Sequence, residues 1–187
     1  MKKTYTLEIA GLKRELPFCK ISDDLMIASF VLLGDVELTV KCAAALIKLI
    51  PEFDVLITAE AKGIPLVHEI AKQLGISRYI LARKSIKLYM TDPCSVSLNS
   101  ITTGKEQSLY VNKDDLDYMK GKKVLVVDDV ISTGQSVLAI NKLVNHAGGE
   151  VVKNVAILAE GNARNRDDII FLEYLPLFDS EGNELSD

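Results

Sequence analysis

The fold of this chain is decided by one stretch of sequence, Val124-Leu125-Val126-Val127-Asp128-Asp129-Val130-Ile131-Ser132-Thr133-Gly134-Gln135-Ser136. Four apolar residues lead into two adjacent carboxylates, and small hydroxyl residues and a glycine follow. A continuous run of valine and leucine is typical of a strand that is buried on both faces of a parallel sheet. Since ligands bind beyond the carboxyl ends of such strands, we expect Asp128 and Asp129 to lie where a ligand binds.

A helix is predicted directly after this stretch. Between Gln135 and His146 the apolar residues recur at helical spacing, and Ala147-Gly148-Gly149 is a typical helix end. The segment from Ser132 to Ser136 therefore forms a helix N-terminus, whose unpaired backbone N–H groups suit a phosphate. The sequence lacks the G-x-x-x-x-G-K-[ST] pattern of a P-loop.

The two halves of the stretch suit different parts of one ligand. Paired carboxylates bind vicinal hydroxyls or a hard cation such as Mg²⁺, and the loop binds a phosphate dianion. A sugar that carries both a diol and a 5-phosphate meets both requirements. The alternative is that Asp128 and Asp129 only cap and solubilise the end of a strand.

The composition is that of a globular chain. It has 187 residues, 48% of them hydrophobic, which is enough for one domain, with or without a small appendage, around a sizeable core. No apolar run has the length of a membrane span and no signal peptide is recognisable, so we expect a cytoplasmic protein without a membrane partner. Cys19, Cys42 and Cys94 are predicted to be reduced thiols. The net charge of −4 does not favour binding to nucleic acid in general.

The rest of the chain alternates strands and helices. Residues 4–16 alternate apolar and polar side chains, which predicts a β-hairpin that turns near Ala10-Gly11. The further predicted elements are a helix at 38–50, a strand at 54–58, a helix at 64–74, and strands at 79–82 and 151–158, with a long polar stretch from 85 to 107. This order predicts an α/β fold with a doubly wound, mostly parallel sheet. The core covers about residues 36–160, and a small hood is formed by residues 1–35 and 161–187.

The stretch from Val124 to Ser136 resembles the phosphoribosyl-pyrophosphate (PRPP) signature of type I phosphoribosyltransferases. That signature consists of four apolar residues, two acids, two apolar residues, a small residue and then Thr-Gly-x-Ser/Thr. The resemblance implies a single phosphoribosyltransferase domain over residues 1–187. It also implies that Asp128 and Asp129 bind the ribose of PRPP. The implied 5-phosphate ligands are the loop residues Ser132, Thr133, Gly134, Gln135 and Ser136.

Pyrophosphate binding is implied at two further loops. In the family a pyrophosphate loop follows the strand predicted at 54–58, where a non-proline cis peptide would join Glu60 and Ala61. The implied pyrophosphate-binding residues are Ala61, Lys62, Gly63, Arg83, Lys84 and Lys87. In related purine enzymes such basic residues reach the site of a neighbouring subunit, so a homodimer is expected. The alternative for the segment from Arg83 to Lys87 is a solvated basic stretch.

The polar segment from Ser100 to Glu106 resembles the flexible catalytic loop of the family. The residues implied are Thr102, Thr103 and Gly104 in the loop, with Lys105 as a catalytic residue. A long loop of this composition in a compact domain is typical of a lid, which excludes water from the reaction. Asp128 and Asp129 are the other implied catalytic residues. They are also the candidate protein ligands of Mg²⁺, the implied cofactor, which binds through PRPP.

The implied reaction is transfer of 5-phosphoribose from PRPP to a purine base, giving a nucleoside 5′-monophosphate and pyrophosphate. The chain resembles adenine and archaeal hypoxanthine phosphoribosyltransferases, and the identity of the base stays open. Hypoxanthine–guanine enzymes carry an acid where this chain has Ser132, and adenine enzymes often carry a glutamate at the position of Thr102. The alternative function is a regulatory protein of the same fold, which senses PRPP or a nucleotide without turnover.

Overall fold

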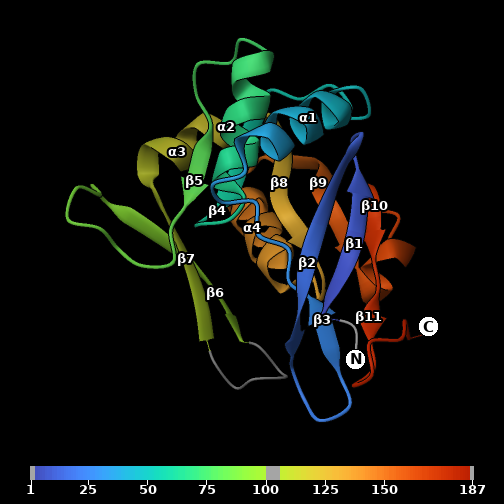
Figure 1. Cartoon of the computed structure of the whole chain (residues 1–187). Coiled ribbons are helices and arrows are strands. Elements are labelled where there is room, and N and C mark those ends of the chain that lie inside the picture. Colours follow the sequence, from blue (N-terminus) through green and yellow to red (C-terminus); the bar gives the residue numbers. More distant parts are fainter. Residues whose placement is uncertain (1–2, 100–105, 186–187) are drawn as a thin grey trace.

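A parallel sheet of five strands forms the centre of the molecule (Figure 1). The computed structural model describes residues 3–99 and 106–185. Every pair of neighbouring strands in this central sheet is parallel. In spatial order the strands are β10 (Ile169–Leu175), β9 (Glu150–Glu160), β8 (Lys123–Ile131), β4 (Val55–Ala59) and β5 (Ile80–Ala82). The core strands predicted from the sequence are therefore members of one sheet.

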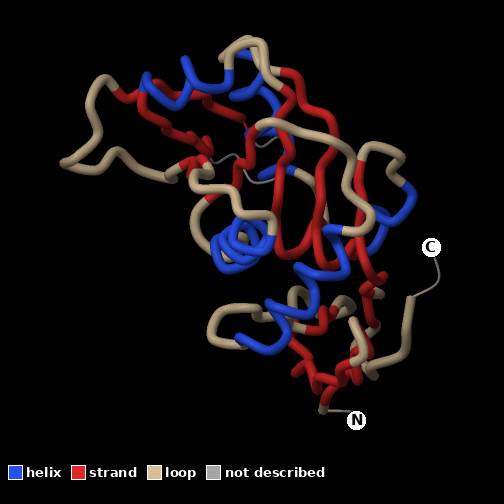
Figure 2. Tube along the Cα trace, turned by 90° about the horizontal axis from the view of Figure 1, so that it is seen from above, coloured by secondary structure: helices blue, strands red, loops and turns tan. Residues whose placement is uncertain are grey.

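Helices cover both faces of the central sheet. They are α1 (Val36–Ile47), α2 (Ile64–Gln73), α3 (Lys113–Met119) and α4 (Gln135–His146). In β8, Leu125 and Val127 pack with buried residues of α1 and α2, whereas Val124 and Val126 pack with those of α3 and α4. Because the side chains of a strand alternate between its two faces, the continuous apolar run serves both helical layers. Seen from above, the strands lie between the helices (Figure 2), which confirms the doubly wound α/β fold.

A second, antiparallel sheet forms the predicted hood. Its strands, in spatial order, are β1 (Thr4–Ile9), β2 (Leu12–Lys20), β3 (Met26–Ala28) and β11 (Leu177–Phe178). β1 and β2 form the predicted hairpin. Ala10 and Gly11 connect them with positive φ angles of 50° and 77°, the backbone geometry of a tight hairpin turn.

The C-terminal tail is divided between the two sheets. The sequence placed the whole of residues 161–187 in the hood, and β11 does pair with β3 there. β10, however, pairs with β9 and forms an edge of the central sheet. Ile169 and Leu175 at the two ends of β10 are buried, so the apolar residues of the tail complete the core before the chain returns to the hood. The short helix η1 (Gly161–Asn165) connects β9 to β10.

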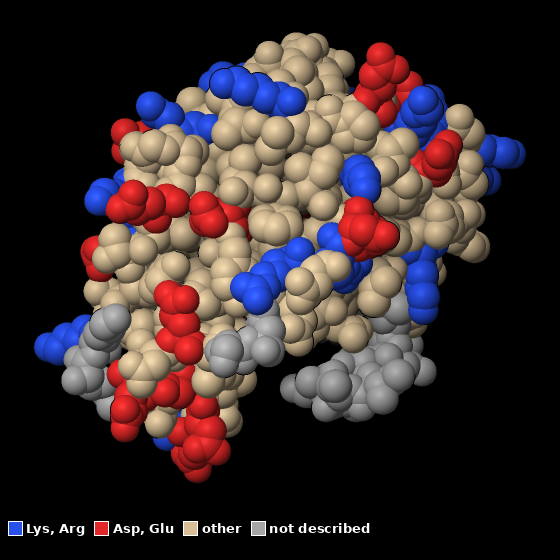
Figure 3. Space-filling view, turned by 90° about the vertical axis from the view of Figure 1, so that its right-hand side faces the viewer, with Lys and Arg blue, Asp and Glu red and all other residues tan. Residues whose placement is uncertain are grey.

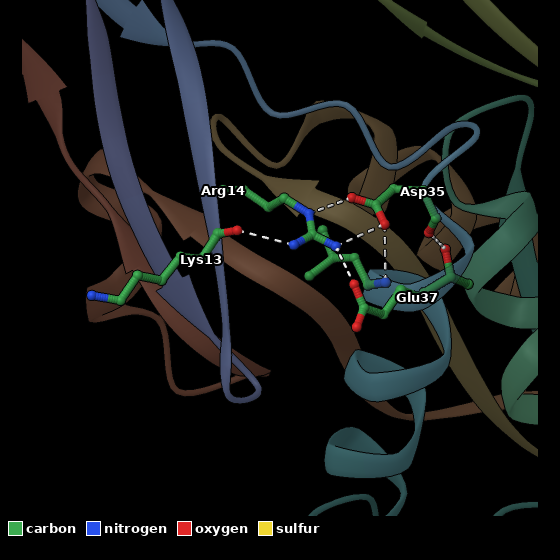
Figure 4. A network of polar contacts seen from close by, with 6 residues as sticks. Lys13, Arg14, Asp35 and Glu37 are labelled. Carbon is green, nitrogen blue, oxygen red and sulfur yellow. Dashed lines mark hydrogen bonds and ion pairs between the residues drawn. The ribbon is translucent and has the colours of Figure 1, made fainter.

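Arg14 joins the hood to the start of α1 (Figure 4). Its Nε donates to Oδ2 of Asp35 at 2.6 Å, and its Nη2 donates to Oδ1 of Asp35 at 3.1 Å and to Glu37 at 3.0 Å. Asp35 also caps the helix, because its carboxylate accepts a hydrogen bond from the backbone N–H of Leu38 at 3.0 Å. This cap explains why α1 begins at Val36, before the predicted start at Leu38.

A hairpin and a short helix were not predicted from the sequence. The hairpin pairs β6 (Pro93–Asn99) with β7 (Glu106–Asn112), and α3 follows directly. β6 and the start of β7 therefore lie in the stretch from 85 to 107, for which the sequence had indicated only a polar character. Leu109 and Val111 of β7 are buried in the layer of α4. In β6, Ser95 and Ser97 face solvent, so only one face of the strand carries an apolar signal.

Charged side chains of both signs are mixed on the face of the molecule shown in Figure 3. No helix within residues 3–99 and 106–185 is long and apolar enough to cross a membrane.

Candidate functional site

Three strands of the central sheet end side by side. β4 ends at Ala59, β5 at Ala82 and β8 at Ile131, and the three strands are parallel. Ala59 and Ala82 are partners in the register of β4 and β5. The loops that follow these strands therefore meet at one edge of the sheet, and parallel sheets bind their ligands at such an edge.

The segment from Ser132 to Ser136 leads from β8 into α4. Gly134 has a φ of 75°, a left-handed conformation that glycine adopts without strain. It is the N-cap residue of α4, and no side chain caps the helix there. The carbonyl of Gly134 accepts a hydrogen bond from the N–H of Leu138 at 2.9 Å, so the helix starts regularly. Its first N–H groups can therefore bind an anion, as the sequence predicts.

Asp128 and Asp129 lie within β8, which continues past them to Ile131. Asp129 is only 4% exposed, and its backbone N–H donates to Oδ1 of Asp128 at 2.9 Å. Oδ2 of Asp129 is buried and has no hydrogen-bond partner within the described part of the chain. Burial raises the pKa of both carboxyl groups, the charge of Asp129 raises that of Asp128 further, and Lys62 opposes both shifts. Asp129 is thus a buried acceptor with unused hydrogen-bonding capacity, and Asp128 beside it is half-buried.

Gly63 brings the loop after β4 against the strand that carries the acids. A side-chain carbon at Gly63 would overlap the hydroxyl of Thr58 and would lie 3.3 Å from Cα of Asp128. Only glycine therefore allows this close approach. The peptide bond between Glu60 and Ala61 is cis, as the family resemblance implied. The predicted pyrophosphate loop and the predicted ribose acids are neighbours.

Glu60 connects the basic segment after β5 to the same edge. Its carboxylate accepts a hydrogen bond from the backbone N–H of Lys84 at 2.8 Å and lies 3.6 Å from both Nη1 of Arg83 and Nζ of Lys87. The Lys84 N–H, followed by the two cations, holds the pKa of Glu60 below its ordinary value. Arg83 also exchanges two backbone hydrogen bonds of 2.8 Å with Tyr110 of β7. The structure therefore brings the basic residues to the loop that contains Lys62.

Sequence reasoning missed this role of Glu60. Its only local signal is its place in the Glu60-Ala61-Lys62-Gly63 loop. The hydrogen bond that its carboxylate accepts comes from the N–H of Lys84, 24 positions later in the chain. The predicted residues Thr102, Thr103, Gly104 and Lys105 lie outside the described residues.

The family of this chain is shown by its similarity to known proteins. A family model described as the phosphoribosyl transferase domain matches residues 37–182. The chain belongs to the type I phosphoribosyltransferases. This membership confirms the resemblance drawn from the PRPP signature, including its purine branch, to which the relatives below belong by name.

Curated relatives of this phosphoribosyltransferase come from archaea. The hypoxanthine/guanine phosphoribosyltransferase of Methanococcus maripaludis strain C6 is 34% identical over 146 residues, which are 78% of this chain and 71% of the relative. That of Methanocaldococcus sp. strain FS406-22 is 33% identical over 113 residues, 60% of this chain and 54% of the relative. The chain thus spans about half the length of the latter protein.

Solved structures of adenine phosphoribosyltransferases share the fold. The enzyme from Thermoanaerobacter pseudethanolicus superposes with a TM-score of 0.66 at 24% identity, covering 92% of this chain and 95% of the other. The Trypanosoma brucei enzyme, in complex with AMP, pyrophosphate and ribose-5-phosphate, superposes with a TM-score of 0.62 at 19% identity, covering 74% and 64%. At these identities the likeness concerns the fold alone.

The acid pair of this phosphoribosyltransferase suits the Mg²⁺ that the sequence implied. Mg²⁺ keeps several waters and binds through one or two carboxylates together with substrate phosphates. Asp128 and Asp129 are two adjacent carboxylates, and the buried, unpartnered Oδ2 of Asp129 is a ligand atom of the right chemistry. Within residues 3–99 and 106–185, no three His, Cys, Asp or Glu side chains gather into a metal cage. The acid pair therefore has the donor chemistry of a Mg²⁺ ion that keeps several of its waters.

A pocket of about 600 Å³ lies away from this site, at the opposite edge of the central sheet. It is lined by residues at the starts of β4 and β8, among them Asp54 and Lys123, and by residues at the ends of α1 and α2. The pocket therefore has no part in the chemistry at the carboxyl ends of the strands.

Proposed function

We propose that this protein is a purine phosphoribosyltransferase, which transfers the 5-phosphoribosyl group of PRPP to a purine base in purine salvage. One observation carries the proposal. A pair of adjacent acids, of which Asp129 is buried, a helix N-terminus and a cationic loop meet at one edge of the sheet. PRPP bears a diol, a 5-phosphate and a pyrophosphate, which are the chemical partners of these three features.

The acid pair and the loop after it act on the phosphoribosyl group. The 5-phosphate accepts hydrogen bonds from the N–H groups and hydroxyls of residues 132–136, which fixes the sugar. Asp128 and Asp129 accept hydrogen bonds from the ribose hydroxyls. Their negative charge stabilises the positive charge that develops at C1 as the C1–O bond breaks and its electron pair leaves with pyrophosphate. A ring nitrogen of the purine forms the new C1–N bond, and the proton of that nitrogen is released to water.

Cationic side chains stabilise the departing pyrophosphate. Arg83 and Lys87 are oriented in advance, because each lies 3.6 Å from the carboxylate of Glu60. Lys62 adds a third cation on the side of the acids, where its charge lowers the pKa of both. Backbone N–H groups of Ala61 and Gly63, together with the side chain of Lys84, complete the proposed pyrophosphate site. Asp128 and Asp129 would hold Mg²⁺, which would supply further neutralisation of the charge on the pyrophosphate. Lys105 stays a predicted catalytic residue.

The purine that accepts the ribose is open between two groups. Archaeal relatives are named as hypoxanthine/guanine enzymes, and the solved structures with the same fold are adenine enzymes. Ser132 follows the acid pair where 6-oxopurine enzymes of the hypoxanthine–guanine type carry an acid. We therefore propose adenine, hypoxanthine, guanine and xanthine as the bases to test.

The proposal includes a homodimer in the cytoplasm. Ile86, Leu88 and Tyr89 are exposed on the segment that carries Lys87. Exposed apolar side chains close together are typical of a surface that another protein covers. A second copy of the chain at this surface would bring basic residues close to its neighbour's site. The free thiols of Cys19, Cys42 and Cys94 agree with a reducing compartment.

A product assay tests the proposed function. The protein is mixed with PRPP, Mg²⁺ and, in separate reactions, adenine, hypoxanthine, guanine, xanthine, uracil or orotate, and both nucleotide and pyrophosphate are followed. We expect turnover with at least one purine, none with the pyrimidines, and loss of turnover when EDTA removes Mg²⁺. Binding of PRPP without turnover of any base would instead favour the regulatory protein.

A further inference from the structure

Arg166 lies against residues 132–136, the phosphate loop, although α4, β9 and η1 separate the two along the chain. A side-chain carbon added to Gly134 would overlap Nη1 of Arg166 and would lie 3.3 Å from its Cζ. The guanidinium therefore occupies the space beside Gly134 that any other residue would fill with its own side chain. Arg166 comes from the connection between η1 and β10, so the contact depends on the position of β10 in the central sheet.

Asp168 holds the guanidinium in this orientation. Nε of Arg166 donates to Oδ1 of Asp168 at 2.9 Å, and Nη2 donates to Oδ2 at 2.7 Å. The amide of Asn154, which is buried in β9, donates to Oδ2 of the same carboxylate at 3.1 Å. Such a two-pronged pair fixes the plane of the guanidinium. Since the fork uses Nε and Nη2, Nη1 is directed toward Gly134.

The phosphate loop itself contains no cation. Ser132, Thr133, Gly134, Gln135 and Ser136 are all uncharged. A phosphate dianion is bound most strongly where a guanidinium adds charged hydrogen bonds to backbone N–H groups. An arginine has five N–H donors, so the fork to Asp168 leaves three for a ligand. The orienting carboxylate therefore does not exhaust the donors of Arg166.

We propose that Arg166 is a binding residue for the 5-phosphate, and that Asp168 is its positioning residue. The inference rests on the proposed function and deepens it, because it adds a cation to the site that holds the phosphoribosyl group. Its Nη1 donates to a phosphate oxygen beside Gly134, and the neutral loop supplies the other hydrogen bonds. The acceptor base takes no part in this contact.

Calorimetry with two separate probes tests the proposal. Ribose 5-phosphate alone tests the 5-phosphate site, and pyrophosphate with Mg²⁺ tests the other loops. We expect Arg166→Gln to raise the Kd for ribose 5-phosphate about tenfold and to leave the Kd for pyrophosphate unchanged. Arg164→Gln is the matched control. Arg164 is close to Arg166 in sequence, but its Cζ lies 4.4 Å from the ring centre of Tyr174. This variant should bind both probes as the unaltered protein does.

Two further variants separate binding from structure. Asp168→Asn keeps the charge of Arg166 but weakens the fork, so it should weaken ribose 5-phosphate binding less than Arg166→Gln does. Arg166→Lys decides the question by the same two probes if Arg166→Gln does not fold. Unchanged binding of ribose 5-phosphate, or equal weakening of both probes, would overturn the role of Arg166. Failure of the proposed function has a different sign, because the unaltered protein would then turn over no base.

Discussion

At the scale of single residues, the acid pair of β8 combines a functional role with a cost in stability. Burial is the main cause that raises the pKa of Asp128 and Asp129. A carboxyl group whose pKa is higher in the folded state holds its proton in that state at a pH where the unfolded chain has lost it. The contribution to the free energy of unfolding is therefore largest below the unfolded pKa and declines as pH rises toward the folded pKa.

The variant Asp128→Asn with Asp129→Asn should lose PRPP turnover and gain stability. At neutral pH the free energy of unfolding should rise by about 1 kcal/mol, because the folded state no longer has to keep the charge of a buried Asp129 beside a half-buried Asp128. Urea denaturation at pH 5 and pH 8 measures the effect, and the gain should be larger at pH 8. Asp114→Asn with Asp117→Asn, which removes two exposed acids of α3, is the matched control. Undiminished turnover would refute the ribose assignment, and a gain independent of pH would refute the burial argument.

Local sequence predicted those residues whose neighbours are close in the chain. The acids and the phosphate loop occupy one short stretch of sequence. They lie close together because β8, which carries the acids, leads directly into the loop and then into α4. Glu60 and Arg166 were missed because their contacts cross between strands. Glu60 accepts a hydrogen bond from the N–H of Lys84, and Arg166 lies beside Gly134. A single sequence carries no pattern for such distant pairs.

At the scale of elements, the hood hairpin and the first core helix depend on one carboxylate. Asp35 receives the guanidinium of Arg14 and caps α1 through the N–H of Leu38. Asp35→Ala should therefore lower the free energy of unfolding by about 1 kcal/mol from the lost cap, and further from the lost ion pair. Arg14→Met should have a smaller effect, because it leaves the cap intact. Chemical denaturation measures both variants.

The pH dependence of this cluster runs in the opposite direction to that of the acid pair. The hydrogen bonds from Arg14, which are the largest cause, hold the pKa of Asp35 below its ordinary value. Its contribution to stability is therefore present above the unfolded pKa and is lost as pH falls through the folded pKa. Glu37→Gln is the control, since Glu37 is largely exposed and does not cap the helix. If Asp35→Ala and Glu37→Gln destabilise the protein equally, the cap is not the source of the effect.

Elements in which apolar residues recur with a clear helical or strand period were predicted well. Elements without such a period were not. The helix at Gln135–His146 has the predicted bounds, because its buried residues recur on one face and glycines end it. β6 was missed because alternating serines resemble a polar loop, and α3 was missed because it has only seven residues. Both pack on the layer of α4 through a few apolar residues such as Val96 and Met119. Tertiary contacts rather than local pattern stabilise these two elements.

At the scale of the whole molecule, the order of strands decides which distant segments meet. The sequence predicted a parallel sheet but assigned the whole tail to the hood, since apolar residues such as Phe171 and Leu172 suit a hood as well as a core strand. The structure pairs β10 with β9 in the central sheet. That pairing brings Arg166 to the phosphate loop, so a site residue follows from a feature of topology.

The exposed apolar segment after β5 leads to the last prediction, which concerns assembly. Leu88 is fully exposed, and Ile86 and Tyr89 flank it. If two copies of the chain bury this segment, a charge at its centre must lose its hydration in the interface. Leu88→Asp should therefore weaken dimerisation about a hundredfold.

Sedimentation equilibrium measures the change in dimerisation. Leu49→Asp, at an exposed leucine just after α1, is the matched control that should stay dimeric. Loss of turnover in monomeric Leu88→Asp, with ribose 5-phosphate binding retained, would support a role of Lys87 across the interface. A strictly monomeric unaltered protein would contradict both the dimer and that role.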